Sequence, residues 1–203
     1  MPSDFDARIP FREQRIAIFA SGAGTNAENV IRYFRSHASI YVALIITNKA
    51  TAGVVDVAAR YGINCEVHRI RGQEDALLVL DVLRRYRIDM VLLAGYLALV
   101  PGVIISAFPH RIINLHPALL PDFGGKGMYG RNVHEAVHAA GVQETGITIH
   151  EVDEVYDHGA IVFQARTPIT PQDTPETIEE KVRELEYRHL PRVVENLLLT
   201  ERN

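Results

Sequence analysis

The stretch "RIAIFASGAGTN", residues 15–26, predicts the first unit of the fold. Its apolar half, "RIAIFA", is typical of a buried strand, and the glycine turn "SGAG" leads from it into a helical pattern over residues 26–35. A strand, a tight turn and a helix in this order form the repeating unit of α/β proteins. The same alternation is therefore expected further along the chain.

Apolar runs and helical spacing do alternate over most of the sequence. They predict strands over residues 41–47, 64–70, 89–95 and 111–116, and helices over residues 52–62, 74–87 and 131–141, with a short helix after Pro101. "GITIHEV" and "AIVFQART" are separated only by the acidic segment "DEVYDHG", which predicts a hairpin, and Thr174 with Pro175 is typical of a helix start.

These patterns predict one α/β domain over residues 15–203, after an N-terminal tail over residues 1–14. The expected fold class is a single-domain, Rossmann-like, mostly parallel sheet with helices on both faces and a C-terminal antiparallel hairpin portion.

The composition narrows the classes of protein. The chain has 203 residues, of which 47% are hydrophobic, enough to bury the core of one domain. Its net charge is −4 and it has no long basic run, which argues against a nucleic-acid partner. Cys65 is the only cysteine, so no intrachain disulfide can form, and residues 1–14 lack the apolar segment of a secretory signal. We predict a cytoplasmic protein.

Residues 90–108 carry no formal charge and approach the length of a membrane span. Gly95, Pro101, Gly102 and Ser106 interrupt this segment, however, and a buried strand followed by a loop and a short helix explains it equally well. We expect no membrane association.

The turn "SGAGTN" is the first candidate binding element. A strand delivers Gly22 and Gly24 to the start of a helix, where free backbone N–H groups and the positive helix end attract an anion such as a phosphate. The spacing also fits the dinucleotide fingerprint G-x-G-x-x-A, but the second strand ends at "TNK" without the acidic residue that holds a ribose, which argues against NAD. A tight turn that simply requires small residues is the alternative.

Two further stretches carry polar side chains next to apolar strands. In "NLHPALLP", residues 114–121, Asn114 and His116 are two positions apart, so on a strand they face the same side at its carboxyl end, where ligands of open α/β sheets bind. In "DEVYDHGA", acidic residues and His158 crowd a turn. The alternatives are a loop start that satisfies its own backbone and a solvated acidic turn; His150 is equally well explained as a satisfied core histidine.

In this order and spacing, "SGAGTN", "LAGYLALVP", "NLHPALLP" and "GITIHEVDEVYDHGAIV" resemble the phosphoribosylglycinamide formyltransferase family over residues 15–191. The resemblance implies an enzyme of de novo purine biosynthesis that transfers the formyl group of 10-formyltetrahydrofolate to the amine of 5-phosphoribosylglycinamide. It also implies a catalytic triad of Asn114, His116 and Asp157.

The residue types of the triad suit this reaction. When an amine attacks a formyl carbon, the oxygen becomes an oxyanion and the nitrogen a cation that must lose a proton. Asn114 and a protonated His116 are expected to donate hydrogen bonds to the oxyanion, while Asp157 keeps His116 protonated and relays the proton. The motif contains no Ser or Cys nucleophile, and a lone His is a poor metal site, so no metal is expected.

The resemblance also assigns the binding residues. Those implied for the phosphorylated substrate are Gly24, Thr25, Asn26, Arg183 and Glu186. Those implied for the folate co-substrate are Leu97, Ala98, Leu99, Val100, Asn114, Asp153 and Asp157. Ala98 departs from the family pattern, as does the start of the third helix, where Gln73 and Glu74 stand with Arg71 nearby. In the glycine-rich loop "FGGKGMYG", we hypothesise a mobile lid that brings Lys126 or Arg131 toward an anion.

Three other activities stay open at this point. A methionyl-tRNA formyltransferase is expected to carry an additional RNA-binding domain, and a formyltetrahydrofolate hydrolase an N-terminal regulatory domain, for which the chain has no room. A non-catalytic nucleotide-binding module would require only the glycine turn. The expected partners are small-molecule substrates; the sequence is also compatible with a homodimer.

Overall fold

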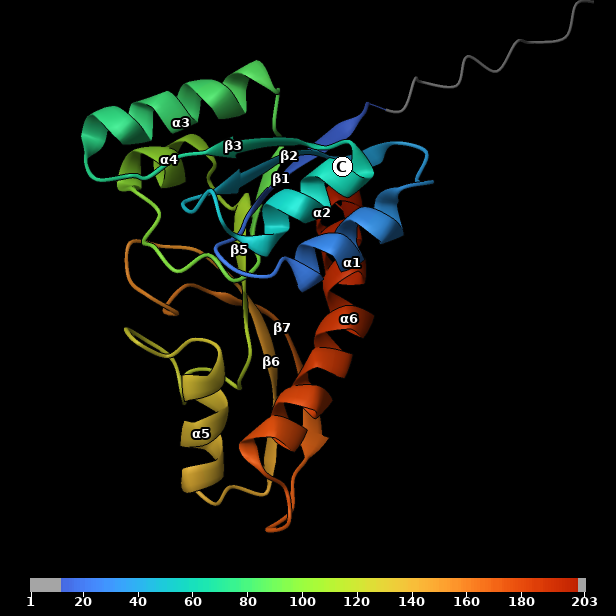
Figure 1. Cartoon of the computed structure of the whole chain (residues 1–203), viewed down its shortest axis with the longest axis vertical. Coiled ribbons are helices and arrows are strands. Elements are labelled where there is room, and N and C mark those ends of the chain that lie inside the picture. The colour runs from blue at the N-terminus through green and yellow to red at the C-terminus, as the bar shows by residue number, and fades with distance from the viewer. Residues whose placement is uncertain (1–11, 201–203) are drawn as a thin grey trace, which may run out of the picture.

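The computed structural model describes residues 12–200 and contains one seven-stranded sheet with the order β3-β2-β1-β4-β5-β6-β7 (Figure 1). The strands are β1 (Gln14–Phe19), β2 (Ile40–Thr47), β3 (Asn64–Val67), β4 (Met90–Leu93), β5 (Ile112–His116), β6 (Glu144–Glu151) and β7 (Ile161–Pro168). The helices are α1 (Thr25–Phe34), α2 (Gly53–Tyr61), α3 (Gln73–Arg85), α4 (Gly102–Ala107), α5 (Arg131–Ala139) and α6 (Pro175–Thr200). Of the tail predicted for residues 1–14, residues 1–11 lie outside the described residues.

The predicted fold class is confirmed. Strands β1 to β5 are parallel, β6 is antiparallel to β5, and β7 completes an antiparallel hairpin with β6. Residues 90–108 form β4, a loop and α4, as expected for a buried strand followed by a short helix. No helix within residues 12–200 has both the length and the apolar character needed to cross a membrane.

Strand β1 lies at the centre of the parallel part of the sheet, and helices cover both of its faces. Ile16 and Ile18 pack into a core beneath α1, α2, α5 and α6, whereas Ala17 and Phe19 pack into a second core beneath α3 and α4. All four side chains are fully buried. Figure 1 shows α3 and α4 on one side of the parallel strands and α1 and α2 on the other. The unbroken apolar run of β1 is thus explained by burial on two faces.

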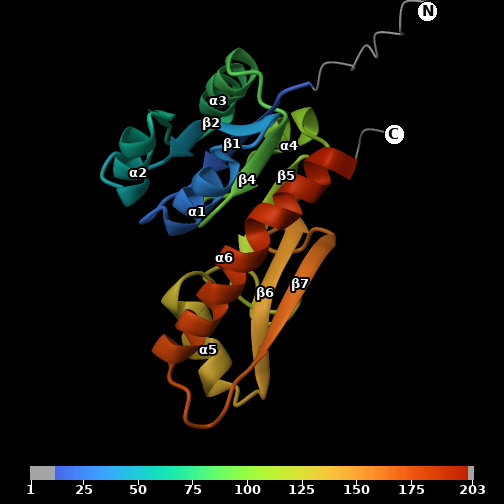
Figure 2. The same ribbon diagram turned by 90° about the vertical axis from the view of Figure 1, so that its right-hand side faces the viewer.

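The antiparallel end brings residues that are distant in sequence next to β5. In the register of β5 with β6, Asn114 lies opposite His150 and His116 lies opposite Thr148. Helix α6 contacts β6, β7 and α5 and continues along α1 (Figure 2). This long helix therefore connects the antiparallel hairpin with the glycine turn after β1.

The turn between β1 and α1 requires glycine at one position. Gly24 has a φ of 80°, and a Cβ atom placed there would lie 2.8 Å from the Cα of Val54. Both the left-handed backbone and the contact with the start of α2 exclude a side chain.

We expect Gly24→Ala to lower the free energy of unfolding by about 1–3 kcal/mol, because the added methyl group is strained at positive φ and collides with backbone atoms. Urea denaturation measures this difference. Gly22→Ala is the matched control, since a Cβ at Gly22 meets no atom within 4 Å. Equal stabilities of the two variants would show that the turn tolerates a side chain at both positions.

Candidate active site

A cavity of about 700 Å³ opens at the carboxyl ends of β1, β4 and β5. Its lining includes every residue that the sequence assigned to a catalytic or binding role: Gly24, Thr25, Asn26, Leu97, Ala98, Leu99, Val100, Asn114, His116, Asp153, Asp157, Arg183 and Glu186. Three separate parts of the chain, namely the glycine turn, the β6–β7 connection and α6, therefore meet at one edge of the sheet, where open α/β sheets bind ligands.

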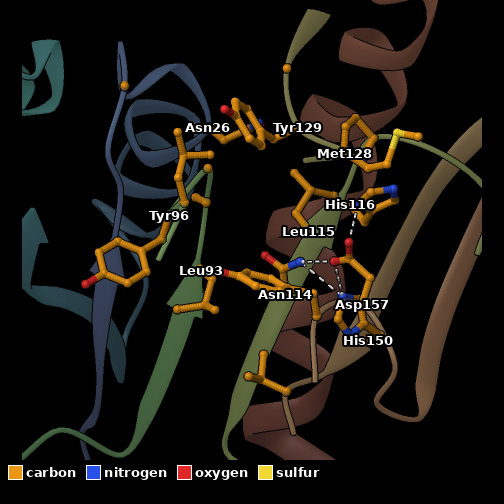
Figure 3. A pocket seen from close by; sticks show the side chains of 18 of the residues that line it. Asn26, Leu93, Tyr96, Asn114, Leu115, His116, Met128, Tyr129, His150 and Asp157 are labelled. Carbon is orange, nitrogen blue, oxygen red and sulfur yellow. Dashed lines mark hydrogen bonds and ion pairs between the residues drawn. The ribbon is translucent and has the colours of Figure 1, made fainter. Parts of the chain in front are cut away.

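Asn114, His116 and Asp157 point toward one another in the middle of this cavity (Figure 3). The Asn114 Nδ2 donates a hydrogen bond to Asp157 Oδ1 at 3.4 Å, and His116 Nδ1 lies 3.5 Å from Asp157 Oδ2. Asp157 has a φ of 55°, in the left-handed region that a non-glycine residue seldom adopts. Backbone strain of this kind is concentrated at functional sites, which makes the position of the carboxylate notable.

His150 joins this group from the neighbouring strand. Its Nδ1 donates to the backbone carbonyl of Glu151 at 2.7 Å, so in the neutral ring its Nε2 is the acceptor. That nitrogen lies 3.0 Å from Asn114 Nδ2 and 3.5 Å from Asp157 Oδ1. His150 therefore fixes the orientation of the Asn114 amide, one N–H of which is directed at the imidazole.

The Asp157 carboxylate is held in its charged form. Burial by itself would raise the pKa of Asp157, but the contacts with His116 and His150 and the hydrogen bond from the backbone N–H of Gly125, 2.9 Å from Oδ2, outweigh it and lower this pKa well below the ordinary value. The lowered pKa favours a negative charge on Asp157 beside the two imidazole rings.

The loop between β5 and α5 contacts the same residues. The Nε2 of His116 donates to the carbonyl oxygen of Phe123 at 2.9 Å, while Gly125 binds Asp157. Both ring nitrogens of His116 thus face acceptors, Nδ1 the Asp157 carboxylate and Nε2 the Phe123 carbonyl. Of the two cations in our lid hypothesis, Lys126 lines the cavity, whereas Arg131 forms ion pairs with Glu135 and Glu176. The lid itself stays a prediction.

One end of the cavity is formed by the first turn of α1. No side chain caps this helix at Gly24. Asn26 donates from Nδ2 to Glu186 Oε2 at 2.9 Å, which ties the turn to α6, and burial raises the pKa of Glu186. Within residues 12–200, the buried Asn26 Oδ1 and His134 Nδ1 have no hydrogen-bond partner. Both residues line the cavity.

Another part of the cavity lining is apolar. Residues 97–100 follow β4 and supply four aliphatic side chains, and the backbone N–H of Leu97 donates to Ser21 Oγ at 3.2 Å. The carboxylate of Asp153 is used within its own turn, where it accepts from the Val155 N–H and contacts His158, each at 2.8 Å. An apolar slot with a few polar groups is typical of a site for a flat heterocycle.

Two histidines and one glutamate that line the cavity had no role assigned in advance: His134, His150 and Glu179. His134 is buried, and burial lowers its pKa. The strand pattern alone could have drawn attention to His150, because it directly precedes the acidic turn. His134 and Glu179 belong to ordinary amphipathic helix patterns, which carry no signal for a site. In the described part of the chain, no three His, Cys, Asp or Glu side chains are grouped to hold a metal ion.

The fold and the cavity define a Rossmann-like α/β protein with a cavity lined by ionisable side chains at the carboxyl edge of its sheet. Residues 14–194 match the formyl transferase family, and the chain belongs to that family.

Relatives of the chain share this fold. This chain is 43% identical over 190 residues to the chloroplastic phosphoribosylglycinamide formyltransferase of Arabidopsis thaliana, in an alignment that covers 90% of this chain and 65% of that protein. It is 33% identical to the phosphoribosylglycinamide formyltransferase of Bacillus subtilis (strain 168), covering 91% of this chain and 95% of that protein. The crystal structure of phosphoribosylglycinamide formyltransferase from Bacillus halodurans has a TM-score of 0.84 at 37% identity and covers 94% of this chain and 98% of that one.

Proposed function

We propose that the protein transfers the formyl group of 10-formyltetrahydrofolate to the amine of 5-phosphoribosylglycinamide. The observation that carries this proposal is the single cavity, whose lining combines an uncapped helix start, the Asn114, His116 and Asp157 group and an apolar slot. The phosphate of the ribonucleotide would occupy the first, the reacting carbon the second and the pterin ring the third. The names of the relatives support the same pair of substrates.

The proposed reaction begins when the amine nitrogen attacks the formyl carbon. A nitrogen–carbon bond forms while the carbonyl electrons move to oxygen, and collapse of this intermediate breaks the bond between the carbon and N10 of the folate. Asn114 and His116 would stabilise the oxyanion by donating hydrogen bonds, an effect worth roughly 3–4 kcal/mol per donor in other enzymes. The Asp157 carboxylate would accept a proton from the attacking amine and deliver it to the departing N10 nitrogen.

This mechanism requires Asn114 and His116 to exchange their present hydrogen-bond partners for the substrate oxygen. The Asn114 amide is directed at His150 and, more weakly, at Asp157, and His116 donates to the Phe123 carbonyl. The 3.4 Å contact with Asp157 is the longer of the two bonds made by Asn114, so this N–H is the one most readily given to the oxyanion. His116 would exchange the Phe123 carbonyl for the substrate oxygen when the loop shifts.

One assay tests the proposed function. The protein is incubated with both substrates, and each is then omitted, while release of the deformylated folate is followed. We expect release only when the amine is present. Release with water alone would assign a hydrolase, and no release with either acceptor would leave the nucleotide-binding module as the explanation.

The acid limb of the pH profile tests the charge state of Asp157. Because the pKa of Asp157 is lowered, its carboxylate stays ionised at the pH where an ordinary carboxyl group takes up a proton. It is protonated only when the pH falls through the lower pKa of the folded protein. The loss of kcat/KM below neutrality should therefore follow protonation of the acceptor amine. With a second acceptor whose amine has a lower pKa, we expect the limb to shift by that difference; a limb at the same pH for both acceptors would assign it to the enzyme.

We also propose a cytoplasmic location, supported by the single cysteine. The relative from Arabidopsis thaliana is named as chloroplastic, and this chain spans 65% of its length. The homodimer stays a prediction, which sedimentation equilibrium measures directly.

A further inference from the structure

Helix α6 presents three ionisable side chains to the cavity. Glu179, Arg183 and Glu186 are spaced at i, i+4 and i+7, so they lie along one face of the helix, and all three line the cavity. Glu186 accepts the hydrogen bond of Asn26 from the first turn of α1. Arg183 is therefore one helical turn away from a residue that touches the proposed phosphate site, within reach of a long flexible side chain.

Arg183 is already engaged by a carboxylate. Its guanidinium donates from Nη2 to Glu179 Oε1, and the two side chains are partly exposed, at 43% and 41%. Because an ion pair at this exposure is weak and exchanges readily, a stronger anion can replace Glu179. A phosphate monoester carries more negative charge than a carboxylate and can accept two parallel hydrogen bonds from guanidinium.

The charge balance of the cavity makes this exchange important. Among the described residues that line it, only Lys126 and Arg183 carry a permanent positive charge, while the carboxylates are Asp153, Asp157, Glu179 and Glu186. Asp157 and Asp153 are held by partners around the β6–β7 connection, and burial raises the pKa of Glu186, which favours its neutral form. Glu179 is thus the charged group that competes directly with a phosphate for Arg183.

We propose that Glu179 is an internal competitor of the substrate phosphate: it holds Arg183 until a phosphate monoester replaces it, and so sets the affinity of the site for phosphorylated ligands. The proposal rests on the proposed function in that it takes the ligand to be the ribonucleotide. Removal of the Glu179 charge then strengthens binding, whereas loss of a residue that contacts substrate would weaken it.

Calorimetric titration of the whole chain tests this inference, with 5-phosphoribosylglycinamide, its dephosphorylated riboside and inorganic phosphate as probes. We expect Glu179→Gln to bind the two phosphate-bearing probes about two- to fivefold more tightly and the riboside unchanged. Arg183→Gln should weaken the phosphate-bearing probes about tenfold or more. In the Arg183→Gln background, Glu179→Gln should have no further effect, because the two changes remove the same interaction.

Glu180→Gln is the matched control, since it removes the same charge from the next, exposed residue of α6, outside the cavity. Equal tightening by Glu180→Gln would overturn the inference in favour of general electrostatics, as would weaker binding by Glu179→Gln, or tightening that persists without Arg183. Glu179→Ala must give the same sign as Glu179→Gln.

These titrations contain no folate, so they fail separately from the proposed function. If Glu179→Gln tightened the binding of inorganic phosphate but the protein transferred no formyl group, the role of Glu179 as a competitor would be supported and the proposed function overturned. If the protein transferred the formyl group but Glu179→Gln left phosphate binding unchanged, the proposed function would be supported and the role of Glu179 overturned.

Discussion

Asp157→Asn should lower kcat by about 10²- to 10⁴-fold, the range that general acid–base groups contribute, while leaving the Kd of both substrates within about threefold. Asparagine keeps the shape of the side chain and tolerates the left-handed backbone that this residue adopts, at a φ of 55°. The substitution therefore isolates the charge from the geometry. It removes the proton acceptor and the negative partner of His116 and His150, whose contacts with Asp157 are each 3.5 Å long.

Steady-state kinetics and equilibrium binding on the same preparation measure this effect. Asp153→Asn is the control, because its carboxylate lies in the same turn but is used by Val155 and His158. We expect its kcat to fall by less than about tenfold. If Asp157→Asn retained more than about a tenth of the wild-type kcat, the proton relay would have to be assigned to another group.

Asn114→Asp should lower kcat by about 10²- to 10³-fold, as the loss of one oxyanion donor does elsewhere. The change is nearly isosteric, but it replaces the amide donors with a second carboxylate beside Asp157, where the present contact is 3.4 Å. Two carboxylates at that distance cannot both ionise freely, so one must take up a proton and the charge pattern around His116 and His150 changes.

The kinetic signature separates a catalytic from a binding role for Asn114. We expect the loss in kcat with KM changed little, because the oxyanion exists only along the reaction path. Asn132→Asp makes the same chemical change on α5, where the side chain donates to the Gly127 carbonyl, and it should keep nearly full activity. A variant with raised KM and intact kcat would show that Asn114 only binds substrate.

The local elements were predictable because their causes are local. The apolar run and glycine turn of residues 15–26 correspond to β1, the turn and the start of α1, and Thr174 with Pro175 does mark the start of α6. The side-by-side placement of Asn114 and His116 follows from the period of a strand and their position at the end of β5. Each of these features depends on a few neighbouring residues, and the sequence contains them in full.

Local sequence patterns did not predict that the cavity residues lie close together. From the residues alone, Asp157 was one acidic residue in a turn and His150 a core histidine; the resemblance to a family, not any spacing, connected them with Asn114. The antiparallel register of β5 with β6 places Asn114 opposite His150 and brings the following turn over the site. That register joins two strands that are separated in the sequence by a loop and α5, so the spacing within either strand does not reveal which residues lie opposite each other.

The sequence by itself therefore determined the order and type of the elements, the glycine turn and the polar pair at the end of β5, since periodicity and backbone sterics act over a few residues. Only the tertiary structure decided that Asp157 and His150 meet Asn114, that His134 is buried beside the cavity, and that the face of α6 with Glu179 and Arg183 lines the cavity. These contacts join segments that are far apart in the chain or depend on which face of a helix is turned inward, and that is settled by the packing of the whole domain.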